Sequence, residues 1–210
     1  MVNYLQNEAP AEQTADAVRA RGATPHLVQG NVRSESDLKR LAKTLESVDV
    51  LVHNAAIAAL KSYDKLRTSH WDLTLESSLR PFWLLTKLTP LADGGSVIGI
   101  SSLGSQRHIP GYAAMGAAKG GMEALTRQLA VELAPRKIRV NTICGGLIQT
   151  DALTYLPEGK KMLEFAEAHT PLGRAGNPED IARAVGLFIS DDAAWITGQV
   201  MVVDGGLSLL

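Results

Sequence analysis

The feature that most constrains the fold is an alternation of short apolar runs with longer stretches in which apolar residues recur at helical spacing. Parallel strands must be joined by crossover connections, usually helices, so this alternation is typical of a parallel sheet with helices on both faces. The candidate strands are residues 1–4, 26–29, 48–52, 96–100, 138–143 and 199–203. The sequence therefore predicts an α/β fold with a doubly wound parallel sheet.

Local signals mark where helices begin and where one of them bends. Ser34 and Asp37 resemble a capping box, because they precede apolar residues at helical spacing. Asn177 followed by Pro178 marks another helix start. Pro81 falls inside a third helical stretch, where it removes a backbone hydrogen bond at a cost of about 3 kcal/mol. We therefore expect a kink near Pro81.

The chain shows no internal repeat, no low-complexity tract and no linker, so we expect one domain over residues 1–210. Residues 150–174 interrupt the strand–helix rhythm with two prolines and two glycines around a short amphipathic stretch. Such a segment is typical of a lid over a ligand cleft, and equally of a plain surface insertion. We expect a substrate lid there.

Composition excludes several classes of protein. The chain has 21 basic and 22 acidic residues, a net charge of −1, which provides no footprint for a polyanion such as nucleic acid. Cys144 is the single cysteine, and the five histidines show no zinc-like spacing, so we expect no disulfide and no metal. No apolar run approaches the roughly 18 residues of a membrane span. We expect a cytoplasmic protein without a membrane or nucleic-acid partner.

Candidate functional residues follow the strands, because a ligand of an open parallel sheet binds outside the carboxyl ends of its strands. Four such strand ends stand out, namely residues 54–56, 101–102, 141–146 and 204–206. The small residues among them permit a close approach of a flat ligand. Taken singly, each is also consistent with an ordinary tight turn.

Tyr112 and Lys119 form the stronger pattern. They are seven residues apart, and seven helical steps return to nearly the same face about 10.5 Å further along the axis. A phenol at the amino end of a helix can stabilise negative charge on a substrate oxygen, and a lysine two turns later can bind hydroxyl groups of a cofactor. The alternative is a tyrosine and a lysine that merely share a helix face.

Several stretches along the chain match motifs of one known family. They are residues 101–107, 109–110 and 112–119, the element Asn54-Ala55-Ala56, residues 171–174 and 203–206, and residues 141–151 with Gly145-Gly146 where most relatives carry Pro-Gly. Together they resemble the short-chain dehydrogenase/reductase superfamily, and within it the enoyl-acyl-carrier-protein reductases of type III. The superfamily's usual tyrosine would fall at Met115, which cannot transfer a proton, whereas Tyr112 to Lys119 matches the Tyr-x6-Lys spacing of enoyl reductases.

The resemblance covers nearly the whole chain and implies a Rossmann-like sheet and a reduction. It implies NADPH-dependent reduction of the C2=C3 bond of a trans-2-enoyl thioester in fatty acid or related acyl-chain biosynthesis. Tyr112 would stabilise the enolate oxygen, Lys119 would bind the nicotinamide ribose, and Ser102 would lie near the substrate carbonyl. The thioester is expected on an acyl carrier protein or another carrier, and the enzyme as a homodimer or homotetramer.

The resemblance also implies a set of cofactor-binding residues. They are Asn31 and Val32 on the adenine side, Asn54 and Ala55 on the ribose side, Lys119, and the strand-end residues Gly145, Gly146, Ile148 and Thr150. No acid follows the first candidate strand, where an NAD-selective relative would bind the ribose 2′-hydroxyl, so NADPH is favoured and NADH is the alternative.

Two departures from the family pattern bear on function. The family opens with a strand, a glycine-rich turn and a helix that cradle the pyrophosphate, yet this chain begins at what resembles the family's second strand. We expect unpaired strand edges at that place, in a shortened form of the working enzyme, or else two half-sheets that close up. Ser78 stands where many relatives place a proton-relay asparagine.

Two other functions stay open at this point. One is a family member that acts at the C=O bond of a ketone or alcohol, against which the Tyr–Lys spacing argues. The other is a shortened, catalytically inactive member that acts as a binding or oligomer partner.

Overall fold

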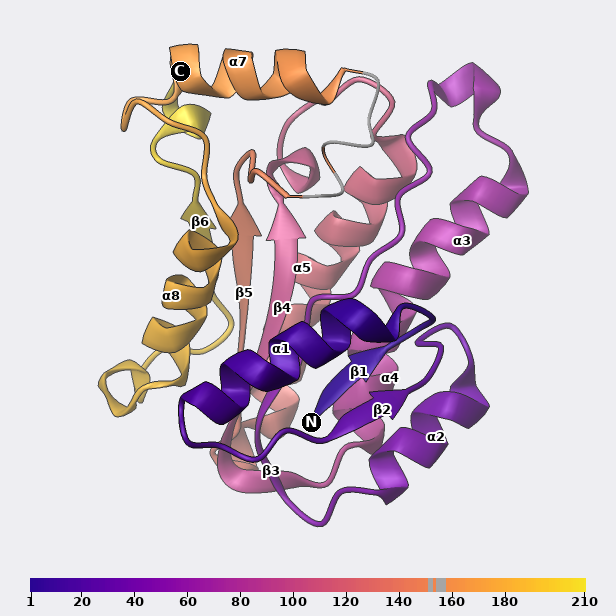
Figure 1. Cartoon of the computed structure of the whole chain (residues 1–210), viewed down its shortest axis with the longest axis vertical. Helices are drawn as coiled ribbons and strands as arrows, with labels where there is room; N and C mark the ends of the chain where they lie inside the picture. Colours follow the sequence, from indigo (N-terminus) through magenta and orange to yellow (C-terminus); the bar gives the residue numbers. More distant parts are fainter. Residues whose placement is uncertain (151–152, 154–157) are drawn as a thin grey trace.

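The computed structural model describes residues 1–150, 153 and 158–210. Its strands are β1 (Val2–Tyr4), β2 (Leu27–Gln29), β3 (Val48–His53), β4 (Leu91–Ser102), β5 (Arg139–Gly145) and β6 (Val200–Val203). The main helices are α1 (Glu8–Ala20), α2 (Glu35–Lys43), α3 (Thr68–Ser78), α4 (Arg80–Leu88), α5 (Ala113–Leu133), α7 (Gly159–His169) and α8 (Pro178–Ile189). Strands and helices alternate as the sequence predicts (Figure 1). None of the described helices is long and apolar enough to cross a membrane.

Both faces of the larger sheet are covered, because successive side chains of a strand point to opposite faces. Val97 of β4 and Val140 of β5 pack with Met122 of α5 in one buried cluster. Their neighbours Ile98 and Ile143 pack with Phe188 of α8 in another. All six of these side chains are at most 2% exposed. The doubly wound α/β architecture is therefore confirmed.

The strands form two separate parallel sheets. β1 pairs with β2, while the larger sheet has the order β3-β4-β5-β6. In the described part of the chain, no ladder joins β1 to β3, so each has an unpaired edge, as expected. Half-sheets that close up are not observed. Leu38 and Leu41 of α2 pack against Leu84 of α4, and this contact joins the small sheet to the large one.

β4 is longer than the sequence predicts, since it begins at Leu91 and not at Ser96. Its register against β3 shifts between Val48 and Val50. A side chain at Gly95 would come within 2.9 Å of the carbonyl oxygens of Ala92 and Asp49, so only glycine fits this irregular start. Gly94 and Gly95 are typical of turns and not of strands, so the sequence did not indicate the start of β4.

Pro81 divides the predicted helix into α3 and α4, as its missing N–H requires. The amide of Phe82 bonds to the carbonyl of Leu79, so the Ser78 carbonyl loses that helical partner. Nε2 of His53 donates to this oxygen over 2.7 Å, which satisfies a buried acceptor. His53 is 2% exposed, and burial lowers the pKa of His53 to about 4.

We predict that His53 makes stability sensitive to mild acid. Its ordinary pKa is 6.5 and its folded pKa is about 4, so the unfolded chain binds the extra proton between these values. Stability is therefore complete above pH 6.5 and falls as the pH is lowered toward 4, by about 3 kcal/mol at most. Urea unfolding between pH 7 and 4.5 should show a smaller loss for His53→Gln than for the wild type.

His26→Gln is the matched control, because His26 is exposed. It should keep the wild-type pH dependence. If His53→Gln loses as much stability as the wild type over this range, the assignment of the acid sensitivity to His53 is wrong.

Candidate active site

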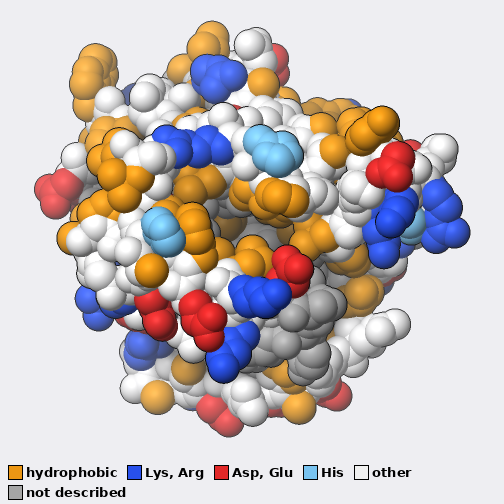
Figure 2. All heavy atoms as spheres, turned by 90° about the horizontal axis from the view of Figure 1, so that it is seen from above, with side chains coloured by type: hydrophobic (Ala, Val, Ile, Leu, Met, Phe, Trp, Pro, Cys, Tyr) orange, Lys and Arg blue, Asp and Glu red, His pale blue; other side chains and the backbone are white. Residues whose placement is uncertain are grey.

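The candidate residues predicted to follow the strands lie at the carboxyl ends of β3 to β6. Ser102 ends β4, Gly145 ends β5, and Asp204 follows β6. Figure 2 views the molecule from above, onto the end where the β4 arrow of Figure 1 points, and shows a hollow with hydrophobic side chains in its walls. This end of the sheet is where a ligand of a doubly wound fold binds.

Tyr112 is the residue that precedes the first turn of α5, so its phenol lies at the positive end of the helix dipole. Its hydroxyl donates to Oγ of Ser102 over 3.0 Å. Burial raises the pKa of Tyr112, while the Ser102 hydroxyl, which can turn to donate to a phenolate, opposes this effect. Tyr112 therefore remains a protonated donor near neutral pH.

Two glycines allow Tyr112 to approach the end of β4. A Cβ at Gly104 would overlap ring carbons Cδ1 and Cε1 of Tyr112. A Cβ at Gly116 would come within 2.6 Å of the Gly104 carbonyl oxygen. The start of α5 thus packs directly on the turn after β4, and this close contact fixes the ring of Tyr112.

Lys119 lies two turns into α5 and is 5% exposed. Its Nζ donates to the carbonyl oxygen of Ile100 over 2.6 Å. Burial lowers the pKa of Lys119 to about 8. Lys119 and Tyr112 therefore contact residues of β4 that are two positions apart, so the structure brings Tyr112, Lys119 and Ser102 together.

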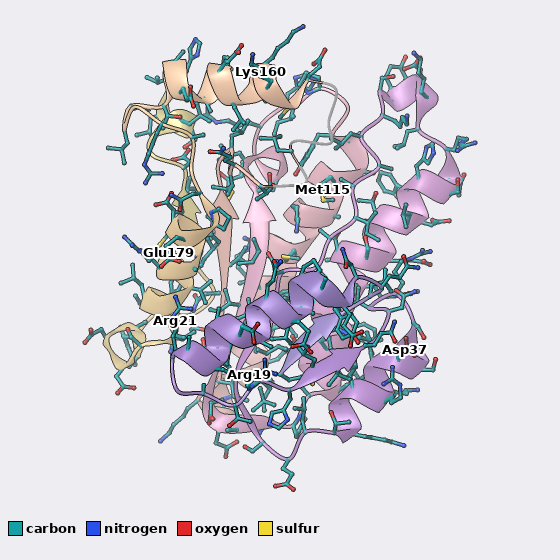
Figure 3. All side chains as sticks on the ribbon, in the orientation of Figure 1. Arg19, Arg21, Asp37, Met115, Lys160 and Glu179 are labelled. Carbon is teal, nitrogen blue, oxygen red and sulfur yellow. The ribbon has the colours of Figure 1, made fainter. Side chains whose placement is uncertain are left out.

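Met115 and Ser78 fill the neighbouring position. Met115 is 3% exposed and lies on α5 beside the carboxyl end of β4 (Figure 3). Oγ of Ser78 lies 4.0 Å from the sulfur of Met115. The carbonyl oxygen of Ser78 accepts the hydrogen bond from His53, so both the hydroxyl and the carbonyl of Ser78 have protein partners. A proton path through Ser78 gains no support from this arrangement.

The predicted cofactor residues are divided between the two sheets. Asn31 and Val32 follow β2, and the Asn31 amide donates to Oδ2 of Asp37 over 2.8 Å. Asn54 and Ala55 are exposed after β3. The remaining predicted residues are Gly145 at the end of β5, Gly146, Ile148, which bridges to Gly176, and the exposed Thr150.

Gly146 has a packing reason to be glycine. A Cβ there would come within 2.6 Å of Cβ of Asp204, where the chain after β5 passes the end of β6. The predicted lid over residues 150–174 includes α7, but residues 151–152 and 154–157 of that prediction lie outside the described residues. The lid therefore stays a prediction.

Sequence reasoning missed two buried polar residues at this site, His53 and Glu123. Glu123 is 7% exposed on α5 and lies against the turn after β4. Its place one turn after Lys119, between buried Met122 and Thr126, was the available signal. Cys144 is fully buried, and burial raises the pKa of its thiol to about 11. That environment is the environment of a small core residue and not of a reactive thiol.

We predict that Gly104→Ala displaces the Tyr112 ring and destabilises the fold by about 1–3 kcal/mol, because the added methyl group overpacks this contact. Urea denaturation measures the loss. Gly186→Ala on α8 is the matched control, since nothing lies within 4 Å of a Cβ there, and it should be neutral or slightly stabilising. Wild-type stability of Gly104→Ala would contradict the close contact.

A doubly wound sheet whose carboxyl edge carries a tyrosine–serine pair and a buried lysine is the arrangement that the resemblance in sequence implies for an oxidoreductase. Comparison with known proteins agrees. The family model described as "Enoyl-(Acyl carrier protein) reductase" matches residues 1–208. The chain belongs to the short-chain dehydrogenase/reductase family, and it is an NAD(P)H-dependent oxidoreductase. The family resemblance in the sequence is therefore confirmed.

Two relatives in sequence are named for different reactions. 1-Cyclohexenylcarbonyl-CoA reductase of Streptomyces collinus is 36% identical over all of this chain and 78% of its own length. The 3-oxoacyl-[acyl-carrier-protein] reductase FabG of Staphylococcus epidermidis is 34% identical over 98% of this chain and 87% of its own. The similarity in sequence thus supports the family and does not choose between the two reactions.

Two solved structures have the same architecture. A mutant short-chain dehydrogenase/reductase of Serratia marcescens superposes with a TM-score of 0.91 at 26% identity, over 98% of this chain and 86% of that one. The NADH-dependent enoyl-[acyl-carrier-protein] reductase of Aquifex aeolicus superposes with a TM-score of 0.89 at 25% identity, over 99% and 85%. Both sheets of the present chain therefore take part in the fold of the family.

Proposed function

We propose that this oxidoreductase uses NADPH to reduce the C2=C3 double bond of a trans-2-enoyl thioester, in fatty acid or related acyl-chain biosynthesis. One observation carries the proposal. The phenol that contacts the end of β4 is Tyr112, seven residues before Lys119, whereas the side chain four residues before the lysine is the buried thioether of Met115. The match to the enoyl reductase family model supports it.

The site residues account for the charge that develops in such a reaction. A reduced nicotinamide, when bound, supplies the hydride that forms the new C–H bond at C3. The electron pair of the double bond moves toward the thioester carbonyl, whose oxygen becomes negative. Tyr112 can turn its hydroxyl from Ser102 to donate a hydrogen bond to that oxygen from the positive end of α5, and the Ser102 hydroxyl lies 3.0 Å away as a second donor. A proton taken up from water at C2 completes the saturated thioester.

The residues present fit the ribose end of a nicotinamide cofactor. An ammonium group has three N–H donors, and Nζ of Lys119 makes one described bond, to Ile100. The others can bind the hydroxyls of the nicotinamide ribose. Asn54 and Ala55 lie exposed at the end of β3 for the ribose side, and Asn31 and Val32 follow β2 for the adenine side. Gly145, Gly146, Ile148 and Thr150 complete the proposed set.

The phosphate groups have a weaker fit. The motif Thr-Gly-x-x-x-Gly-x-Gly does not occur in the sequence. Leu5 and Gln6 follow β1, so no carboxylate stands there to select the 2′-hydroxyl of NAD. This favours NADPH over NADH.

We predict that Tyr112→Phe lowers turnover of a trans-2-enoyl thioester by about 10²-fold or more, because one donor to a developing oxyanion contributes about 2.7–4 kcal/mol. NADPH affinity should change little. Lys119→Met should weaken NADPH binding as well as turnover, since its proposed partners are ribose hydroxyls that are present before the reaction. Assays of NADPH oxidation measure turnover, and fluorescence titration measures NADPH affinity.

Met115→Ala is the matched control on the same helix and should retain enoyl reduction. Full enoyl reduction by Tyr112→Phe, combined with its loss in Met115→Ala, would show that the assignment of the phenol is wrong.

Reduction of a 3-oxoacyl thioester is the second candidate, because FabG of Staphylococcus epidermidis is 34% identical to this chain. Both reactions place negative charge on an oxygen near Tyr112, so both use the same donor. They differ in the carbon that receives hydride. Parallel assays with a trans-2-enoyl and a 3-oxoacyl thioester of equal chain length distinguish them, and reduction of the ketone alone would overturn the enoyl proposal.

The thioester could be carried by coenzyme A or by an acyl carrier protein, which is acidic. Of the cations near α7, Arg174 binds Asp180 through two hydrogen bonds of 2.6 and 2.8 Å, which stabilise the start of α8. Lys160 is highly exposed and 3.7 Å from Glu164. Carrier docking, if it uses this side of the molecule, therefore relies on Lys160 and Lys161 rather than on Arg174.

We also propose that the protein forms a homodimer or homotetramer through α3, α4 and α5. These helices border an open groove of about 520 Å³, whose walls include Leu75, Leu79, Trp83 and Leu125. Trp83 is 43% exposed, and Leu75, Leu79 and Leu125 are partly buried. Apolar side chains gathered around an open groove are typical of a surface that binds another protein.

We predict that light scattering at micromolar concentration gives a dimer or tetramer, and that Trp83→Glu shifts it toward monomer. A charge placed in a buried apolar interface loses its hydration without gaining a partner. Trp195→Glu is the control, because Trp195 is fully exposed outside these helices. A wild-type protein that is a clean monomer would contradict the proposal.

A further inference from the structure

Glu123 is a buried acid that the proposed reaction does not use. It lies on α5, one turn after Lys119, and is 7% exposed. It takes part in none of the ion pairs found among the described residues. A buried carboxylate without a cation needs hydrogen-bond donors, because burial otherwise costs the hydration of its charge.

The donors come from the turn that follows β4. Oγ of Ser101 donates to Oε1 of Glu123 over 2.6 Å. Oγ of Ser105 lies 2.5 Å from the same oxygen and 2.8 Å from the carbonyl oxygen of Ser102. Nε2 of Gln106 lies 3.5 Å from Oε2. The carboxylate therefore gathers the residues on both sides of Ser102.

Ser102 is in turn the partner of Tyr112, whose hydroxyl donates to its Oγ over 3.0 Å. Tyr112, Lys119 and Glu123 belong to or begin the same helix, and each contacts the chain between Ile100 and Ser105. The helix thus holds the end of β4 at three points. Glu123 contacts the end of the strand and the turn through two hydroxyl groups, those of Ser101 and Ser105.

We propose that Glu123 is a positioning residue that fixes the turn after β4 and so sets the geometry of the Ser102–Tyr112 pair. A carboxylate suits this role because both serine hydroxyls and the Gln106 amide approach it as donors. Glutamine at 123 would keep one acceptor oxygen but place an amide N–H₂ against the Gln106 donor. The proposal rests on the role of Tyr112 in the proposed function. Its test measures the surroundings of Tyr112 directly and does not depend on that function.

The test follows Tyr112 directly by NMR of protein labelled with ¹³C at Cζ of tyrosine. The chain has four tyrosines, and Tyr112→Phe assigns the resonance. In Glu123→Met, which keeps the length and removes the acceptors, we expect the Tyr112 resonance to move by more than its linewidth while those of Tyr4 and Tyr63 stay in place. The pKa of Tyr112 should rise further, because the Ser102 hydroxyl that opposes the effect of burial is displaced.

Three other variants complete the design. Glu123→Gln should give a smaller shift in the same direction. Ser105→Ala, which keeps the acid and removes the link to Ser102, should also move the Tyr112 resonance. Glu132→Gln, at an exposed position of the same helix, should change nothing.

An unchanged Tyr112 resonance in folded Glu123→Met overturns the proposal. If Glu123→Met does not fold, Ser105→Ala decides, and an unchanged resonance there overturns it. These outcomes are independent of any enzyme activity, so failure of the positioning role is distinguishable from failure of the enoyl reductase function. Where enoyl reduction is measured, Glu123→Gln should lower kcat about tenfold at unchanged KM, which corresponds to about one hydrogen bond.

Discussion

The candidate site depends on the close packing of α5 against the carboxyl half of β4. Glycines make this approach possible, since a side chain at Gly99 would strike Met122 and one at Gly104 would strike Tyr112. Because the helix lies so near the strand, its polar side chains reach the strand's carbonyls and hydroxyls directly. The hydrogen bonds of Tyr112, Lys119 and Glu123 follow from that distance, and they fix both the direction of the helix and the position of its charges.

The unpaired strand edges give the molecule a second constraint. The loop that contains Asn31 and Val32 belongs to the small sheet, so no strand ladder holds it beside Asn54. Its position depends instead on the apolar contact between α2 and α4 and on Arg33, which binds Glu76 of α3 through hydrogen bonds of 3.0 and 3.3 Å. Side chains therefore supply the connection that a continuous sheet would otherwise provide.

Much of the fold could be predicted because its signals are local. Ser34 and Asn177 cap α2 and α8 as expected, and Pro81 separates α3 from α4. The spacing of Tyr112 and Lys119 placed them on one helix face, and the structure adds that both contact β4. The first residues of β4 were not predicted because their glycines are typical of a turn. His53 and Glu123 were missed because their meaning comes from partners distant in sequence, the Ser78 carbonyl and the turn after β4.

Lys119 shows what such a site costs the stability of the protein. Its pKa of about 8 in the folded state lies well below the ordinary 10.5, so at neutral pH the folded chain holds a proton on a group whose surroundings disfavour it. The corresponding cost is about 3 kcal/mol, a large fraction of the stability of an ordinary domain. The charged form of Lys119 is thus kept at a cost in folding free energy, and its hydrogen bond to the carbonyl oxygen of Ile100 offsets part of that cost.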